Sequence, residues 1–298
     1  MAILEGKKFA DERLLDSAGH ILHAYYKAPQ VSGRLDAKAV VVYGEELNPM
    51  LELIEKMDAK LEGAAKELFF PLYVDYQCVK QAIEKGYSPI MVILGADCAK
   101  ANMSWDCGAC GFPTCNEFNR YCKDNSSMGL AAVGPNCVWK GLDYGIACDY
   151  ACAAAGELNV ENRILSTFGL ISSLLGYLDG TTNNLGLALG PSKEMWWYSR
   201  PSLAKWLDRD LYEGMMQKNY TNFFQMFSTK LNPRVKKDGA WWDEEPEISV
   251  AIQPDDDYAE RQAEIQGVIM ESVIEVRPQV EEMKEKLAKR TAVLDEKN

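Results

Sequence analysis

The sequence lacks any hydrophobic run long enough to cross a lipid bilayer. Its longest mostly apolar stretch, Phe168–Leu178 (FGLISSLLGYL), is far shorter than the roughly 20 residues that a membrane-spanning helix needs. The first residues, MAILEGKKFADE, also lack the basic and then apolar layout of a signal peptide. We therefore expect a cytoplasmic protein without membrane insertion, whose cysteines stay reduced or bind metal.

Basic residues and histidines are scarce. The 298 residues include 32 Lys and Arg, 44 Asp and Glu and 2 His, which gives a formal net charge of −12. That charge argues against a protein that wraps nucleic acid or lies on an anionic membrane, so we expect neutral or basic partners and no nucleic acid. His20 and His23 lie on one expected helix without a carboxylate pattern around them, so they are expected to be partly exposed helix residues rather than metal ligands.

Two common catalytic motifs are also missing. The sequence contains no G-x-x-x-x-G-K-[ST] phosphate loop and no G-x-S-x-G nucleophile elbow. Nucleotide hydrolysis and serine esterase chemistry are therefore unsupported.

Cysteine, by contrast, is abundant. The chain has 9 cysteines, an odd number that excludes a complete set of intrachain disulfides. Because 47% of the residues are hydrophobic, the chain can also bury a sizeable core around a chemical site.

Helical and extended patterns alternate along the first two thirds of the chain. Helices are expected over 11–27, 46–61, 73–84, 137–157 and 160–178, and strands over 38–43, 89–94 and 184–189. This order predicts an α/β (α+β) layered domain with a short central sheet over residues 1–200. Residues 97–137, rich in Cys, Gly, Pro and Asn, are expected to form a site loop inserted into it. Residues 201–298 are expected to form an aromatic-rich and helical C-terminal extension.

The C-terminal region is unusually aromatic. Five of the seven tryptophans fall close together and must bury against something; they are Trp196, Trp197, Trp206, Trp241 and Trp242. The acidic stretches 243–247 and 255–257 are expected to be solvated linkers, although 255–257 could bind a hard cation weakly.

A heptad seam follows in the same region. Six apolar residues step by 4, 3, 4, 3 and 4, which is typical of a helix packed on another helix; they are Ile269, Val273, Val276, Val280, Met283 and Leu287. The seam suits packing on the body of this chain or on a partner equally well. Pro278 lies inside it and is expected to kink or divide the helix.

The main chemical signal is Cys107-Gly-Ala-Cys110-Gly-Phe-Pro-Thr-Cys115, a C-x2-C-x4-C spacing. An iron–sulfur cluster needs thiolates that converge from several sides, so the backbone must turn tightly around it. Gly108 and Gly111 stand where such turns are required.

The fourth ligand has two candidates, Cys122 and Cys137. If the chain is helical from Thr114 to Tyr121, Cys115 and Cys122 are separated by about 10 Å along the axis, which is wide for one cluster. Cys137 is preferred, because Gly134-Pro135-Asn136 can turn the chain back and starts a helix whose positive end favours an anionic group. Two alternatives stay open for the loop: buried reduced cysteines, and a zinc site without the usual second C-x2-C knuckle.

The loop CGACGFPTC resembles the 4Fe-4S domain of the corrinoid iron–sulfur protein's large subunit and of B subunits of membrane electron-transport complexes. Further pieces resemble, in order, the uncharacterised ferredoxin-domain family of anaerobic bacteria and archaea over about residues 10–200. These pieces are Ala28-Pro29, Val42–Leu47, CGACGFPTC, Gly134–Cys137, Leu142–Ala147 and Asn159–Arg163. The resemblance implies a 4Fe-4S cluster held by Cys107, Cys110, Cys115 and Cys137, and it says little about substrate.

Two features depart from that family. Cys148 and Cys152 stand where the family has apolar residues, and the chain continues beyond the family's usual end. Being four residues apart on one helix, these thiols could form a redox pair or a second metal site with Cys78 or Cys98. The favoured interpretation is that they are small residues in a helix interface.

A second layout is similar to nitroreductase-type flavoproteins. It consists of a helix, Ala-Pro, a strand, and later Asp143–Ala147 and Leu185–Pro191. In that family basic residues hold the phosphate of FMN between two subunits, a role that Arg34, Lys38 or Lys193 could serve.

Three functions are therefore predicted from the sequence. The first is a 4Fe-4S redox protein that transfers single electrons in anaerobic metabolism and docks a partner oxidoreductase or a second copy through its C-terminal region. The second is an FMN-dependent oxidoreductase in which the cluster relays electrons. The third is an assembly or scaffold subunit of a larger redox complex.

Overall fold

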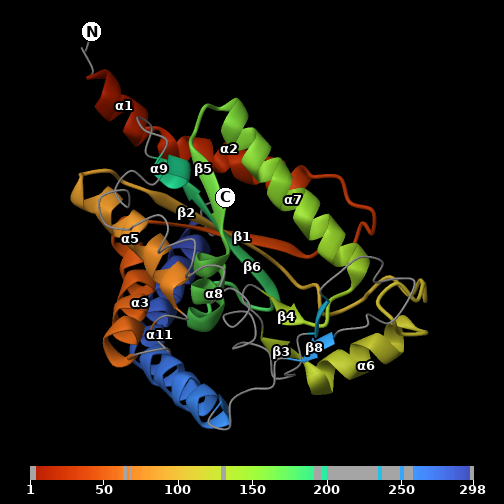
Figure 1. The fold of residues 1–298 in the computed structure, drawn as a ribbon. Helices are drawn as coiled ribbons and strands as arrows, with labels where there is room; N and C mark the ends of the chain where they lie inside the picture. The colour runs from red at the N-terminus through yellow and green to blue at the C-terminus, as the bar shows by residue number, and fades with distance from the viewer. Residues whose placement is uncertain are drawn as a thin grey trace.

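The computed structural model describes residues 5–62, 66, 69–128, 132–190, 196–199, 234–236, 249–251 and 258–295. A four-stranded antiparallel sheet with the order β1-β2-β6-β5 forms its centre (Figure 1). The strands are β1 (Ala37–Tyr43), β2 (Ile90–Ala96), β5 (Asn162–Leu165) and β6 (Asn183–Leu189). β2 is buried along its whole length because it lies inside the sheet and has helices on both faces.

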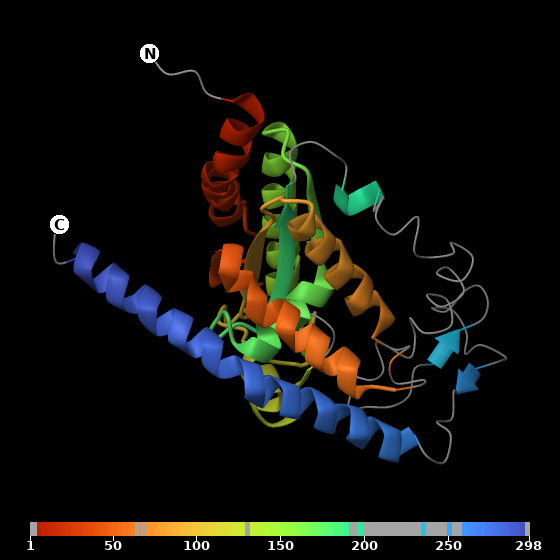
Figure 2. The same ribbon diagram turned by 90° about the vertical axis from the view of Figure 1, so that its left-hand side faces the viewer.

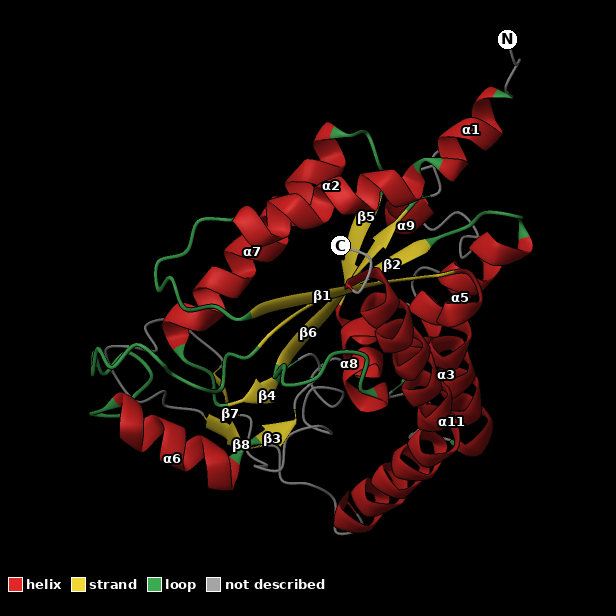
Figure 3. Ribbon diagram, turned by 180° about the vertical axis from the view of Figure 1, so that it is seen from behind, coloured by secondary structure: helices red, strands yellow, loops and turns green. Residues whose placement is uncertain are grey.

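Helices cover the sheet on both sides (Figure 3). One face packs on α2 (Leu14–Lys27) and α7 (Val138–Glu157). The other face packs on α3 (Asn48–Lys60), α5 (Phe70–Glu84), α8 (Ser166–Leu175) and α11 (Tyr258–Asp295). Two separate hydrophobic cores result, one on each face, and the predicted α+β layered domain is confirmed.

Shorter elements complete the described part of the chain. They are α1 (Gly6–Glu12), the 3-10 helix η1 (Gly44–Leu47), α6 (Cys115–Asn125), the paired strands β3 (Ser127–Met128) and β4 (Val133–Gly134), α9 (Trp196–Ser199), and the paired strands β7 (Arg234–Lys236) and β8 (Ser249–Ala251). Among the described helices, none combines the length and apolarity needed to cross a membrane.

The contact between α8 and β6 depends on a glycine. A Cβ atom on Gly169 would lie 2.1 Å from the backbone oxygen of Asn184, so a larger residue cannot occupy this position without a shift of the backbone. The missing side chain therefore lets α8 lie directly on the sheet.

The predicted helix over 160–178 is partly wrong. The segment begins with β5, which pairs with β6 at the edge of the sheet, and only then becomes α8. Four residues, NRIL, are too few to show the alternation of a strand, so long-range pairing decides their conformation. The helix ends before Gly176, whose φ of +72° provides a left-handed cap.

The seam of α11 packs on the chain's own body as far as Val280. Ile269, Val273, Val276 and Val280 are buried in the core beside α3 and α8, and Figure 2 shows α11 lying along α3. Leu287, in contrast, is 57% exposed.

Salt bridges and a proline shape the same helix. Glu275 of α11 binds Lys56 at 2.7 Å and Lys60 at 2.9 Å.

Pro278 does not divide the helix, contrary to one of its two expected effects. Ile274, whose carbonyl would accept the missing bond from Pro278, lies on the exposed side, where water can bind that oxygen.

Several sequence expectations fall on other parts of the chain. Trp196 and Trp197 are buried, and Trp196 donates from its indole nitrogen to the backbone oxygen of Cys78 at 2.9 Å. Other predicted features lie outside the described residues; they are Trp206, Trp241, Trp242, Lys193 and the acidic stretches 243–247 and 255–257. The division into 1–200 and 201–298 stays a prediction.

Candidate metal centre

The four cysteines of the predicted site line one pocket. Cys107 and Cys110 come from the loop after β2, Cys115 is the first residue of α6, and Cys137 immediately precedes α7. The other lining residues are Ala101, Met103, Gly108, Ala109, Phe112, Val138 and Trp139. Residues separated by 30 positions in the sequence thus meet where α6 and α7 begin (Figure 1).

The loop turns tightly at two glycines. Gly108 has φ +71° and Gly111 has φ +84°, both in the left-handed region, and the N–H of Gly111 donates to the carbonyl of Gly108 at 2.9 Å. A Cβ atom at either glycine would meet no atom within 4 Å, so the backbone conformation and not space requires glycine here. This conformation agrees with the turns expected from the sequence.

Two helices begin at the pocket. Thr114 caps α6 by accepting from the N–H of Glu117 at 3.1 Å, and the carboxylate of Asp106 accepts from the N–H of Cys115 at 2.7 Å. Cys137 is the N-cap residue of α7, and its own N–H donates to the carbonyl of Cys98 at 2.8 Å. The positive ends of both helix dipoles therefore lie beside the sulfur atoms, where they favour negative charge.

Cys107 is the most exposed of the four cysteines. The indole N–H of Trp139 donates to its Sγ atom at 3.3 Å. This bond and one from the backbone of Ala109 lower the pKa of the Cys107 thiol, the Ala109 bond being the larger cause. N–H donors of this kind stabilise a thiolate, the form that binds iron.

A small hydrophobic core supports the site. Ala101, Phe118, Cys122 and Cys137 are buried in it, and Phe112 packs edge to face on Phe118 with ring centroids 5.6 Å apart. These contacts hold the cysteine loop against α6. They also keep part of the pocket wall dry, a condition that tunes the potential of a redox centre.

Cys122 does not line the pocket. It lies in the small core, where its Sγ atom donates to the carbonyl of Pro135 at 3.6 Å, and burial raises its pKa to about 11. Of the two candidates, Cys137 lines the pocket and Cys122 does not, and the role of Cys137 as the fourth ligand stays a prediction.

The remaining cysteines are buried or half-buried, and none of them forms a disulfide in the described residues. Cys98, Cys148 and Cys152 pack between the sheet and its α2–α7 face, whereas Cys78 lies in the core of the opposite face. Burial raises the pKa of Cys98 and Cys148 to about 12 and that of Cys152 to about 11. These positions agree with the favoured interpretation as packing residues, and the placement of Cys78 does not suit a shared second site.

The donor set at the pocket is compatible with an iron–sulfur cluster. In the described residues, no three His, Cys, Asp or Glu side chains form a group that could hold one metal ion. Each thiolate of a multi-iron cluster binds a separate iron atom. Four thiols, two helix N-termini and N–H donors to sulfur fit an anionic iron–sulfur cluster.

The two histidines and the basic residues considered for a flavin phosphate lie in other surroundings. His20 and His23 are exposed on α2, with ring centroids 6.2 Å apart, in agreement with their expected role as helix residues. Lys38 donates to the backbone oxygen of Asp179 at 2.9 Å and lies 3.5 Å from the carboxylate of Asp36. Nothing in the described residues joins Arg34 to Lys38 around a flavin phosphate, so FMN is not supported.

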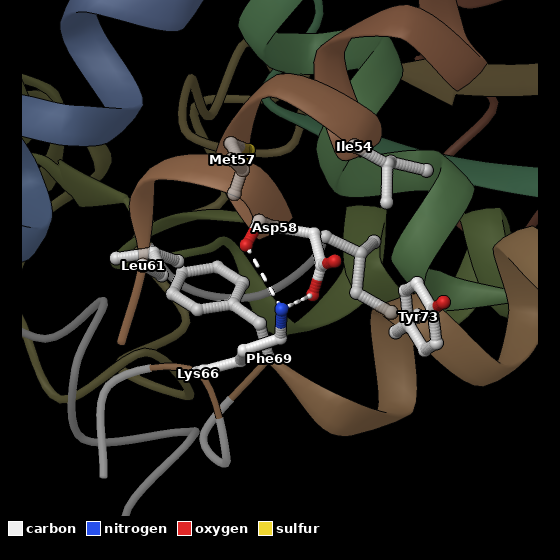
Figure 4. A pocket seen from close by; sticks show the side chains of 8 residues that line it. Ile54, Met57, Asp58, Leu61, Lys66, Phe69 and Tyr73 are labelled. Carbon is white, nitrogen blue, oxygen red and sulfur yellow. Dashed lines mark hydrogen bonds and ion pairs between the residues drawn. The ribbon is translucent and has the colours of Figure 1, made fainter. Parts of the chain in front are cut away.

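Another pocket, between α3 and the start of α5, is lined mainly by apolar side chains (Figure 4). The amino group of Lys66 crosses it to the carboxylate of Asp58, 3.0 Å away, and to the backbone oxygen of the same residue at 3.1 Å. The charges of Lys66 and Asp58 thus neutralise each other at this pocket.

Sequence reasoning missed three residues beside the cysteines. Trp139 bonds to sulfur, Trp105 packs on Trp139, and Lys140 is 1% exposed with its amino group donating to the carbonyl of Lys100 at 2.9 Å. The order Cys137-Val-Trp139-Lys140 at the start of a helix could have indicated that Trp139 and Lys140 lie beside the cysteines. A ligand at the N-cap places the next residues of the first turn beside the metal.

Comparison with known proteins supports an iron–sulfur role. Residues 133–200, which include Cys137 but not the CGACGFPTC loop, match the model of a family described as "Uncharacterized protein containing a ferredoxin domain". An "Uncharacterized protein" of Archaeoglobus fulgidus is 28% identical over 177 residues, which cover 59% of this chain and 86% of the relative. No solved structure matches the chain. These findings confirm the predicted resemblance to the uncharacterised ferredoxin-domain family, whose ferredoxin domain indicates an iron–sulfur electron-transfer protein.

Proposed function

We propose that the chain is a 4Fe-4S protein that exchanges single electrons with a partner oxidoreductase in anaerobic metabolism. The observation that carries this proposal is the one pocket that Cys107, Cys110, Cys115 and Cys137 line together. The ferredoxin domain of the matching family supports an iron–sulfur cluster, and the C-x2-C-x4-C loop with one distant cysteine supports the four-iron type.

When bound, such a cluster supplies a reversible one-electron couple. The chain's own residues then have three tasks. The four thiolates hold the group, while Gly108 and Gly111 bend the loop around it. The N-termini of α6 and α7 oppose its negative charge, which matters in a protein whose net charge is already −12. Trp139 donates its N–H to the Sγ atom of Cys107.

Metal analysis of the full chain, purified without oxygen, tests the proposal. We expect about four irons and four sulfides per chain and a broad visible absorbance that bleaches on reduction. Stoichiometric zinc without iron would contradict the proposal. Flavin released by denaturation would instead favour the FMN-dependent alternative.

Association through the C-terminal region is a further part of the proposal. The seam of α11 is buried as far as Val280, but Leu287 at its end is 57% exposed and Met283 is half-buried. An exposed leucine in a heptad position suits contact with a second copy or a complex subunit. Light scattering should show that Leu287→Glu reduces the mass of any oligomer, and an unchanged mass would argue against contact at this position.

A further inference from the structure

The strongest unexplained feature beside the cysteines is a pair of tryptophans. The ring of Trp105 packs edge to face on that of Trp139, with centroids 6.3 Å apart and planes at 70°. Trp139 in turn donates to the Sγ atom of Cys107 at 3.3 Å, and Trp105 is 48% exposed. The two rings therefore lie beside a candidate cluster ligand at the molecular surface.

The backbone holds Trp105 in place at a cost. Its neighbours Ser104 and Asp106 have φ of +55° and +48°, although neither is glycine. Such residues are uncommon in the left-handed region and persist where their surroundings impose it. The bond from the N–H of Cys115 to the carboxylate of Asp106 supplies one such constraint, since it ties the loop to the first residue of α6.

Apolar surface continues beside the pair. Val138, which lines the cysteine pocket, is 48% exposed, and Leu142, one turn further along α7, is 46% exposed. Together with Trp105 and Trp139 they form the tryptophan patch, a name kept below for these four residues. Exposed tryptophan is enriched at the centres of protein interfaces, where it supplies a large share of the binding energy.

The negative charge of the chain favours a partner with a basic surface. The protein carries −12, Asp106 follows Trp105 directly in the chain and its carboxylate accepts from the N–H of Cys115, and iron-bound thiolates would add negative charge. Exposed indole faces attract cations as well. A partner with a basic rim around an apolar centre is complementary to this surface and would be steered towards it.

We propose that the tryptophan patch is the docking surface for a basic, one-electron redox protein, with Trp105 as its central contact. The inference rests on the proposed function, because the patch borders the proposed cluster. It places the redox partner at the cysteine pocket and not at the C-terminal region. One electron leaves the reduced cluster and reduces the partner by one electron, without transfer of a proton.

Two forms of cytochrome c, a small basic haem protein, serve as probes. The zinc-substituted form accepts no electron, so calorimetry with it measures binding alone. The iron form reports the rate of oxidation of the reduced protein in stopped-flow experiments, and hexaamminecobalt(III), a small cationic oxidant, reports intrinsic reactivity. The variants are Trp105→Leu and, as a matched control, Tyr150→Leu, because Tyr150 is 45% exposed on the same helix as Trp139 but three turns away.

We expect Trp105→Leu to keep its iron and its reduction potential. It should raise the Kd for zinc cytochrome c about tenfold and lower the rate of oxidation by iron cytochrome c about tenfold. Changes of this size are usual when an interface loses a tryptophan. Oxidation by hexaamminecobalt(III) should change less than about twofold, and Tyr150→Leu should change nothing. Rates and Kd values equal to wild type in an iron-loaded Trp105→Leu protein would overturn the docking inference alone. A wild-type protein without iron would overturn the proposed function, and the inference with it.

Discussion

Gly111 offers a quantitative test of how the loop holds its metal. Its φ of +84° places it in the left-handed region, and an alanine Cβ there would meet no atom within 4 Å. The substitution Gly111→Ala therefore adds backbone strain without a steric clash. An L-residue in this region is strained by about 1–2 kcal/mol, which corresponds to a loss of metal affinity of about 5- to 30-fold if the metal-bound loop keeps this turn and the metal-free loop relaxes out of it.

A competition between the protein and an iron chelator under anaerobic conditions measures this loss. The chelator concentration that removes half of the iron should fall by the same factor of about 5 to 30. Gly111→Asn should lose less, because asparagine tolerates the left-handed conformation better. Gly145→Ala is the matched control, since Gly145 is helical and a Cβ there also meets nothing within 4 Å. Iron retention equal to wild type in Gly111→Ala would refute the role assigned to this turn.

Two further predictions concern the scaffold. Val276→Ala should lower the free energy of unfolding, measured in urea, by about 2 kcal/mol, since Val276 is 0% exposed. The control Ile274→Ala, on the exposed side of α11, should change this free energy by less than about 0.5 kcal/mol. Similar losses in the two variants would mean that α11 is not packed as described. Burial raises the pKa of the Cys148 thiol to about 12 from an ordinary value near 9, so this thiol stays protonated to higher pH in the folded state than in the unfolded state. Its contribution to the free energy of unfolding should therefore be constant below about pH 9 and fall from there towards pH 12. Cys148→Ala should flatten this fall in a series of melting temperatures, and an unchanged slope would argue against the buried thiol as its source.

Most of the layered domain could be predicted from local patterns. The expected strand 89–94 and helix 73–84 correspond to β2 and α5 with shifts of a few residues, because their apolar periodicity matches their burial. β5 could not be predicted, since its four residues become a strand only by pairing with β6. The antiparallel order of the sheet likewise depends on contacts between distant segments.

The candidate site was predictable at its cysteines and not at its surroundings. The spacing of Cys107, Cys110 and Cys115 indicates a metal loop, and a turn before Cys137 indicates the fourth ligand. The Trp105–Trp139 contact joins the loop to α7 across 34 positions, and no local pattern encodes it. Pro278 shows the converse, because a local rule predicted a kink or a division of the helix, and solvent on one side of α11 permits a helix that is not divided.

The iron content of two serine variants tests most directly whether Cys137, and not Cys122, completes the proposed cluster. Serine is a favoured N-cap residue, so Cys137→Ser should still start α7 and fold, which circular dichroism can verify. Under anaerobic purification, Cys122→Ser should contain as much iron as the wild type, about four per chain, and Cys137→Ser should lose most of it. Full iron in Cys137→Ser together with loss of iron in Cys122→Ser would contradict the assignment of the metal centre.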